Sequence, residues 1–204
     1  MCSLPKIAVF GCGYWGKNHV RTLAELGALA CVVDQDENLA RELAEKHGVE
    51  VRDAQSVFAD PAIDGITMAL PAQYHAETAK QAFAAGKHVF AEKPIALDVA
   101  DAQSMVDAAK KAERVLMAGH VLCHHNAFRA ILSLIKDGTL GDVKYVQSHR
   151  LGFGKFHTKF DAAWDLAPHD LSLILSIAGT DPVDIDAVRV SVTDDQTDSA
   201  HIHL

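Results

Sequence analysis

Residues 7–16, IAVFGCGYWG, join a short apolar run directly to a glycine-rich turn. The apolar run predicts a buried strand. The apolar and small residues from Val20 to Gly27 recur at i, i+3, i+4 and i+7, which predicts a helix. The turn between them has the pattern G-x-G-x-x-G, with glycines at positions 11, 13 and 16. A strand, a tight turn and a helix are therefore expected in direct succession.

Strand and helix patterns continue to alternate as far as residue 122. A helix is expected between Asp36, as its N-cap, and Gly48, as its end. Strands that are apolar on both faces and alternate with amphipathic helices predict a parallel sheet covered on both sides. Residues 1–122 are therefore predicted to form a Rossmann-type α/β domain with a doubly wound parallel sheet. Its further strands are expected over 28–34, 64–71, 87–94 and 114–122, and its further helices over 74–85 and 98–112.

Residues 123–204 show a different pattern, in which the strands alternate with period 2. They predict an incomplete α+β substrate domain with an open, mostly antiparallel sheet and an unprotected edge. Either a partner chain completes this sheet, which would make a homo-oligomer, or the chain is truncated at its C-terminus. Helices are expected over 126–138 and 165–178, and strands over 141–151, 183–192 and 199–204.

The composition indicates a cytoplasmic protein without a nucleic-acid or membrane partner. The 204 residues carry a net charge of −8 with dispersed acidic residues, which disfavours a phosphate backbone as partner. No apolar run reaches the ~18 residues of a membrane span, and the start of the chain lacks a signal-peptide pattern. The four cysteines lack paired spacing, which indicates reduced thiols. The 12 histidines show no spacing of a closed metal site, so no metal is expected.

The glycine-rich turn predicts a dinucleotide site because it leaves a strand, opens a helix and is followed by an acid at the end of the next strand. Gly11 allows the tight turn, Gly13 lets a pyrophosphate approach the backbone, and Gly16 lets helix and strand pack closely. Asp34 would accept hydrogen bonds from the ribose hydroxyls and repel a 2′-phosphate, which favours NAD over NADP. Trp15 either covers the pyrophosphate or packs, and a turn without a ligand is the alternative for the whole motif. The expected cofactor residues of the turn are Gly11, Gly13, Tyr14, Trp15 and Gly16.

Residues 161–179, DAAWDLAPHDLSLILSIAG, place titratable groups at the start of an apolar helix. Asp165 and His169 are four residues apart and would share one face of that helix. Pro168 would be tolerated in the first turn. His169 titrates near neutral pH and is suited to act as a general base. The alternative is that Asp165 caps the helix and His169 is a polar surface neighbour.

These motifs, in this order along the whole chain, resemble the glucose–fructose oxidoreductase/inositol dehydrogenase (Gfo/Idh/MocA) family. Within it, 13–18 and 164–170 look most like members of the UDP-N-acetylglucosaminuronate 3-dehydrogenase type. Family members usually continue for another hundred residues or more, so the resemblance also implies a C-terminally truncated chain. The motifs are the turn at 11–16, Asp34, ALPAQYHAETA at 69–79, AEKPIAL at 91–97, and Asp165 with His169.

The resemblance implies roles for further residues. It places Lys93 at the reacting hydroxyl, where an ammonium can donate a hydrogen bond to a developing alkoxide. Either Lys93 or His169 takes the proton, and Asp165 orients His169 or binds a sugar hydroxyl. The resemblance also implies that Pro71, His75 and Glu92 lie on the cofactor side of the site. His75 would lie near the nicotinamide ribose, and Glu92 is next to Lys93.

The loop before the 165–178 helix carries basic residues suited to phosphate or carboxylate groups of a substrate. A solvated loop is the alternative interpretation. These substrate-binding candidates are Arg150, Lys155 and His157.

The leading hypothesis is an NAD-dependent oxidoreductase that transfers a hydride between a sugar or sugar-nucleotide hydroxyl and nicotinamide. The C3 hydroxyl of a UDP-linked N-acetyl sugar acid is the candidate group. The alternatives are a non-catalytic NAD-binding regulator or inactive truncated remnant of the same family, and an enzyme acting on a dihydrodiol or an imine.

Overall fold

The computed structural model describes residues 4–151, 162–191 and 199–204. The chain divides into two compact units, Met1–Gly119 and His120–Leu204. Each unit is described by itself. In the described part of the chain, no helix is both long enough and apolar enough to cross a membrane.

The first unit is built on a six-stranded sheet in the order β3-β2-β1-β4-β5-β6, in which every neighbouring pair is parallel. The strand order reverses between β1 and β4, and ligands of such sheets bind in the crevice at the carboxyl ends of the strands there. The predicted doubly wound parallel sheet is confirmed. Its strands are β1 Ile7–Phe10, β2 Leu29–Val33, β3 Glu50–Val51, β4 Gly65–Met68, β5 His88–Ala91 and β6 Leu116–Ala118.

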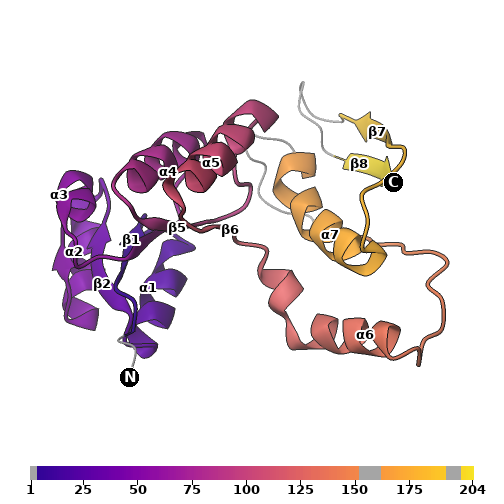
Figure 1. Ribbon diagram of the computed structural model, residues 1–204, viewed down its shortest axis with the longest axis horizontal. Helices are drawn as coiled ribbons and strands as arrows, with labels where there is room; N and C mark the ends of the chain where they lie inside the picture. Colours follow the sequence, from indigo (N-terminus) through magenta and orange to yellow (C-terminus); the bar gives the residue numbers. More distant parts are fainter. Residues whose placement is uncertain (1–3, 152–161, 192–198) are drawn as a thin grey trace. The chain divides into compact units, whose positions relative to one another are not determined.

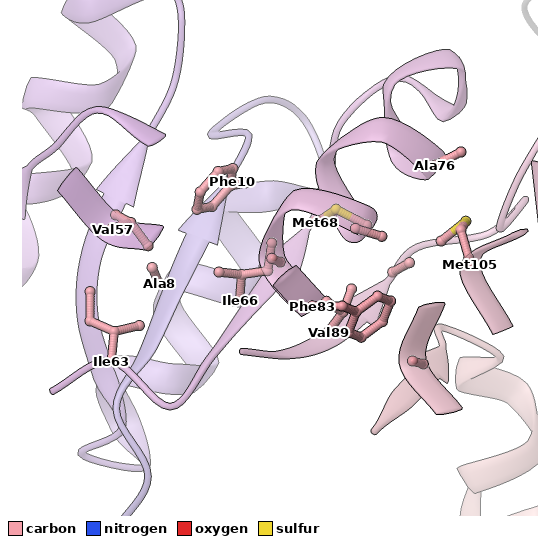
Figure 2. Packing of buried hydrophobic residues seen from close by; sticks show 14 of the residues in the cluster. Ala8, Phe10, Val57, Ile63, Ile66, Met68, Ala76, Phe83, Val89 and Met105 are labelled. Atoms are coloured by element: carbon pink, nitrogen blue, oxygen red, sulfur yellow. The ribbon is translucent and has the colours of Figure 1, made fainter. Parts of the chain in front are cut away.

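Helices cover both faces of this sheet. One hydrophobic cluster joins the sheet to α1 and α2. A larger cluster on the other face joins it to α3, α4 and α5 and contains the packed residues of Figure 2, among them Ile66, Phe83 and Met105. The helices α4 and α5 run side by side (Figure 1). The helices are α1 Gly16–Glu25, α2 Glu37–His47, α3 Ala54–Ala59, α4 His75–Ala84 and α5 Val99–Ala112, with a 3₁₀ turn η1 at Ala72–Tyr74.

Local signals set the ends of the helices. The Asp36 side chain accepts hydrogen bonds from the backbone N–H groups of Asn38 and Leu39, which begins α2, and Gly48 ends it with φ 67°. Asp98 caps α5 in the same way, through the N–H of Asp101. The predicted caps of the 36–48 helix are therefore confirmed.

The second unit contains less regular structure. A 3₁₀ turn η2 at Val121–His124 precedes α6 Asn126–Lys136 and α7 Ala162–Ala178, and the strands β7 Asp186–Val190 and β8 Ser199–His203 form an antiparallel pair. This pair agrees with the predicted open antiparallel sheet.

Two expectations for this unit were wrong. Residues 141–151 do not form a strand, because period-2 alternation produces a strand only where a neighbouring strand accepts its hydrogen bonds. Pro168 does not lie in a first turn, since the helix is already present at Ala162 and Pro168 is inside it. The missing Pro168 N–H therefore removes an interior hydrogen bond of α7.

Candidate functional site

The turn between β1 and α1 needs glycine at two positions for its own geometry. Gly11 has φ 92°, and a Cβ there would lie 2.6 Å from the backbone oxygen of Ala69. A Cβ at Gly16 would lie 1.9 Å from the backbone oxygen of Gly11. Gly13 differs, because nothing lies within 4 Å of its Cβ position. The fold therefore does not require glycine at 13, and the open space there suits the close approach of a ligand phosphate to the N-terminus of α1.

Asp34, which directly follows β2, is held against this turn. Its Oδ2 accepts a hydrogen bond from the Cys12 N–H, and its Oδ1 accepts one of 2.8 Å from the Asp36 N–H. The parallel pairing of β1 and β2, with Phe10 opposite Val33, brings the two segments together. The carboxylate thus stands at the carboxyl edge of the sheet next to Gly13, where an adenosine ribose would lie.

Cys12 in the same turn is not a reactive thiol. It is 1% exposed, and burial together with the Asp34 charge raises its pKa to about 12. A thiol with such a pKa stays protonated at neutral pH and is a poor nucleophile.

Glu92, at the end of β5, is the centre of a hydrogen-bond network. Its Oε1 accepts hydrogen bonds of 2.7 Å from Trp15 Nε1 and 2.9 Å from His19 Nε2. Its Oε2 accepts a longer one of 3.3 Å from the Lys93 N–H. The Nδ1 of His19 lies 2.6 Å from Thr67 Oγ1 on β4. The network links the glycine-rich turn to the strands that end at the same edge.

The network determines the charge of Glu92. Burial raises the pKa of this carboxyl group, but the hydrogen bonds from His19 and Trp15 outweigh burial and hold the pKa below its ordinary value. Glu92 is therefore ionised at neutral pH. The sequence interpretation named Glu92 and Trp15 but missed His19 and Thr67. The available signal was a histidine directly before Val20, on a helix expected to pack against the sheet.

His75 begins α4 and is 1% exposed. Its Nε2 lies 2.9 Å from the Leu70 oxygen and its Nδ1 lies 3.2 Å from the Ile95 oxygen. Burial lowers its pKa, so the neutral imidazole is favoured. His75 thus joins the segment after β4 to the segment after β5. Its contact with a nicotinamide ribose stays a prediction, as does that of the exposed Pro71.

The lysine of the predicted catalytic set belongs to the first unit, and the acid and histidine belong to the second. Lys93 follows β5 at the carboxyl edge of the sheet and is half-buried. Asp165 and His169 lie one turn apart on α7, as predicted, and both are half-buried. Their catalytic roles stay predictions.

Arg150 is already engaged by an acid. Its Nε donates to Asp170 Oδ2 at 2.6 Å and its Nη2 donates to Oδ1 at 3.2 Å, while Ser148 Oγ lies 2.6 Å from Oδ1. Burial raises the pKa of Asp170, but these donors outweigh it and lower the pKa. The pair holds residues 148–150 against α7, so a substrate contact of Arg150 stays a prediction. Lys155 and His157 lie outside the described residues.

No group of three or more histidine, cysteine or acidic side chains suited to a metal ion occurs in the residues that the structure describes.

Comparisons with known proteins agree on one family. Residues 5–120 match the family described as "Oxidoreductase family, NAD-binding Rossmann fold" (GFO_IDH_MocA). The chain is 32% identical over 197 residues to UDP-N-acetylglucosamine 3-dehydrogenase of Acidithiobacillus ferrooxidans, covering 96% of this chain and 61% of that protein. It is 31% identical over 140 residues to myo-inositol 2-dehydrogenase of Thermotoga maritima, covering 67% of this chain and 42% of that protein.

Solved structures show the same relationship. The UDP-N-acetylglucosamine 3-dehydrogenase GnnA from A. ferrooxidans superposes with a TM-score of 0.87 at 28% identity, covering 98% of this chain and 63% of that one. GenD2 from gentamicin A biosynthesis, in complex with NAD, superposes with a TM-score of 0.83 at 25% identity, covering 99% and 62%. The chain therefore spans less than two thirds of the length of these relatives.

Proposed function

The chain belongs to the Gfo/Idh/MocA family of NAD-binding oxidoreductases, and we propose that it is an NAD-dependent dehydrogenase acting on a sugar-nucleotide hydroxyl. The observation that carries this proposal is the Asp34 carboxylate, held by the Cys12 N–H next to the open position at Gly13. A carboxylate and exposed helix N–H groups side by side suit a ribose diol and a pyrophosphate.

The same carboxylate supports the choice of NAD over NADP. A 2′-phosphate at the ribose would carry negative charge toward Asp34, and no arginine of the described contacts neutralises this acid. Repulsion between like charges at close range raises the free energy of an NADP complex.

The substrate class rests on the relatives. Those cited above are a UDP-N-acetylglucosamine 3-dehydrogenase and a myo-inositol 2-dehydrogenase, which are by name dehydrogenases of a sugar nucleotide and of a cyclic polyol. The first covers nearly the whole of this chain. We therefore propose a UDP-linked N-acetyl sugar or its acid, oxidised at C3. A cytoplasmic homo-oligomer formed through the second unit remains our prediction.

The chemistry divides between the cofactor and the chain. NAD, when bound, supplies the hydride acceptor. Lys93 would donate a hydrogen bond to the developing alkoxide oxygen at the carboxyl edge of the sheet. His169 would accept the hydroxyl proton, directly or shared with Lys93, and Asp165 would orient the His169 ring.

The experiment that tests this proposal is a calorimetric titration of the chain with NADH, with NADPH as the control. We expect binding of NADH and much weaker binding of NADPH, and we expect Asp34→Ser to reduce the difference between them. An unchanged preference in Asp34→Ser would mean that Asp34 does not face the ribose. A folded chain that binds neither would contradict the proposed function.

Turnover is then tested with NAD and UDP-N-acetylglucosamine by the absorbance of NADH. Lys93→Ala should reduce turnover by about 10²- to 10⁴-fold, because it removes a group that acts on the reacting oxygen. NADH affinity should stay close to that of the parent. Equal loss of both would contradict the role of Lys93. Tight NADH binding without turnover of sugar nucleotides would instead support a non-catalytic NAD-binding protein.

A further inference from the structure

Four segments of the first unit meet at the Glu92 carboxylate. The turn after β1 supplies the Trp15 indole N–H, and α1 supplies the His19 imidazole. The backbone N–H of Lys93 approaches from the end of β5. The fourth segment, at the end of β6, contributes Gly119, which has no side chain. A Cβ at this position would lie only 2.9 Å from Glu92 Oε2. Glycine at 119 therefore leaves room for the carboxylate.

The backbone of Gly119 is held by a hydrogen bond, so a side chain at this position would displace the Glu92 carboxylate. Its N–H donates a 2.7 Å hydrogen bond to the Ala91 oxygen, which joins the end of β6 to the end of β5. Gly119 itself is buried. The Glu92 carboxylate is thus bordered at Gly119 by backbone that is hydrogen-bonded to Ala91.

His19 is held in one orientation by contacts on three sides. Its Nδ1 lies 2.6 Å from Thr67 Oγ1, and its Nε2 lies 2.9 Å from Glu92 Oε1. Its ring packs edge-on against Phe90, with centroids 5.5 Å apart and planes at 70°. The His19 and Glu92 side chains are only 12% and 14% exposed. A carboxylate with so little access to water needs its donors from the protein, and His19 is one of them.

We propose that His19 is a positioning residue of the enzyme. It holds the Glu92 carboxylate, and through it the Trp15 indole of the cofactor turn and the backbone N–H of Lys93. The effect on turnover rests on the proposed function, whereas the effect on Trp15 rests on the contacts alone. Displacing a reacting group by about 1 Å can cost on the order of 100-fold in rate, so the anchor of Lys93 matters although His19 touches no reactant.

The first test is spectroscopic and needs no ligand. The chain has two tryptophans, so Trp164→Phe leaves Trp15 as the sole indole. In this background, His19→Ala should increase acrylamide quenching of Trp15, because Glu92 loses its second anchor and no longer holds the indole. His19→Gln should restore the parent quenching, since its amide can reach the Nε2 position next to Glu92.

Matched variants separate this effect from a general loosening of the protein. His19→Asn places its amide near the Nδ1 position, keeps a partner for Thr67 and cannot reach Glu92, so it should behave like His19→Ala. Gly119→Ala would place a Cβ 2.9 Å from Oε2 of the same carboxylate and should also increase quenching. His47→Ala, at the far end of α2, should match the parent. Urea unfolding of each variant shows whether an increase in quenching only reflects a loss of folding stability.

The second test measures turnover of UDP-N-acetylglucosamine with NAD. We expect kcat to fall about 10- to 100-fold in His19→Ala and His19→Asn, with a smaller change in the KM for NAD, and to recover in His19→Gln. Parent quenching and parent kcat in His19→Ala would overturn the proposal, as would equal behaviour of the Asn and Gln variants. Failure of the parent to bind NADH would overturn the proposed function instead, and the Trp15 measurements would still decide the role of His19.

Discussion

The two units of the chain bury their apolar residues to very different degrees. Of the described hydrophobic residues that are buried, all but Phe128 lie in Met1–Gly119. In the second unit α7 has no buried residue and every residue of β7 is exposed. Yet both units contain strands and amphipathic helices of ordinary length. Regular secondary structure thus says little about whether a segment carries its own core.

The difference has a functional meaning. The first unit holds the glycine-rich turn, Asp34 and Lys93 on a sheet that its own helices cover on both faces. The second unit holds Asp165 and His169 on a helix without a closed core of its own in the described residues. A rigid sheet with its own core suits a binding site whose ligand is large and is the same in every reaction cycle. Under the proposed function, Asp165 and His169 of the second unit would act on the substrate.

The largest effect is expected from dividing the chain. Residues 1–119 alone should unfold cooperatively in urea and keep NADH binding, because both hydrophobic clusters of the sheet lie inside this segment. Residues 120–204 alone should show no cooperative transition. Circular dichroism during a urea titration of both fragments tests this. A non-cooperative 1–119 fragment would show that the two units form one folding unit.

Single substitutions that shorten an apolar side chain should show the same difference between the two units, with smaller losses of stability than division of the chain. Phe83→Ala, at a side chain 2% exposed, should lower the free energy of unfolding by about 3–5 kcal/mol. Leu175→Ala, at a side chain 38% exposed on α7, should change it by less than about 0.5 kcal/mol. Urea unfolding of the full chain measures both. Similar losses would mean that α7 is buried in solution.

Glycine substitutions test which glycines the backbone geometry requires and which are free to change. Gly16→Ala forces a Cβ to 1.9 Å from the Gly11 oxygen and should cost about 1–3 kcal/mol of stability or more. Gly13→Ala should leave stability unchanged, because nothing lies within 4 Å of the Cβ position, and it should weaken NADH binding if the proposed pyrophosphate site is there. In the second unit Gly138 has φ 80° with nothing within 4 Å, so Gly138→Ala should cost only about 1–2 kcal/mol. Urea unfolding and calorimetry measure the two effects, and full NADH affinity in Gly13→Ala would contradict the assignment.

The last expected effect concerns the dependence of stability on pH. Burial lowers the pKa of His75 in the folded chain, so below the ordinary histidine value of about 6.5 the unfolded chain binds the proton first. Stability should therefore be complete above that value and decrease as the pH falls below it, by at most about 1.4 kcal/mol per pH unit. His75→Gln should flatten this dependence between pH 7 and pH 5. Unfolding in urea at several pH values measures the slope, and an equal slope in parent and variant would show that burial of His75 is not its cause.

Much of the first unit followed from local patterns. β1 was predicted to the residue, and the Asp36 cap and Gly48 end of α2 were predicted as observed. These features depend on residues within one or two turns of each other. In the second unit the same reasoning predicted a strand over 141–151 that the structure lacks. Alternation is necessary for a half-buried strand but does not provide the neighbouring strand that would pair with it.

Only some residues of the candidate site could be predicted from local sequence patterns. The glycines of the turn and the acid at Asp34 could be found from spacing alone, because a strand, a glycine-rich turn, a helix and an acid after the next strand follow one another along the chain in a recurring order. Their contacts with Ala69 and Cys12 were not needed to find them. The contacts of Glu92 with Trp15 and His19 join residues 77 and 73 positions apart. They exist because the sheet order places β4 between β1 and β5, which brings the turn, α1 and the end of β5 to one edge. Strand order depends on how all the apolar faces are buried together, and no short segment contains that information.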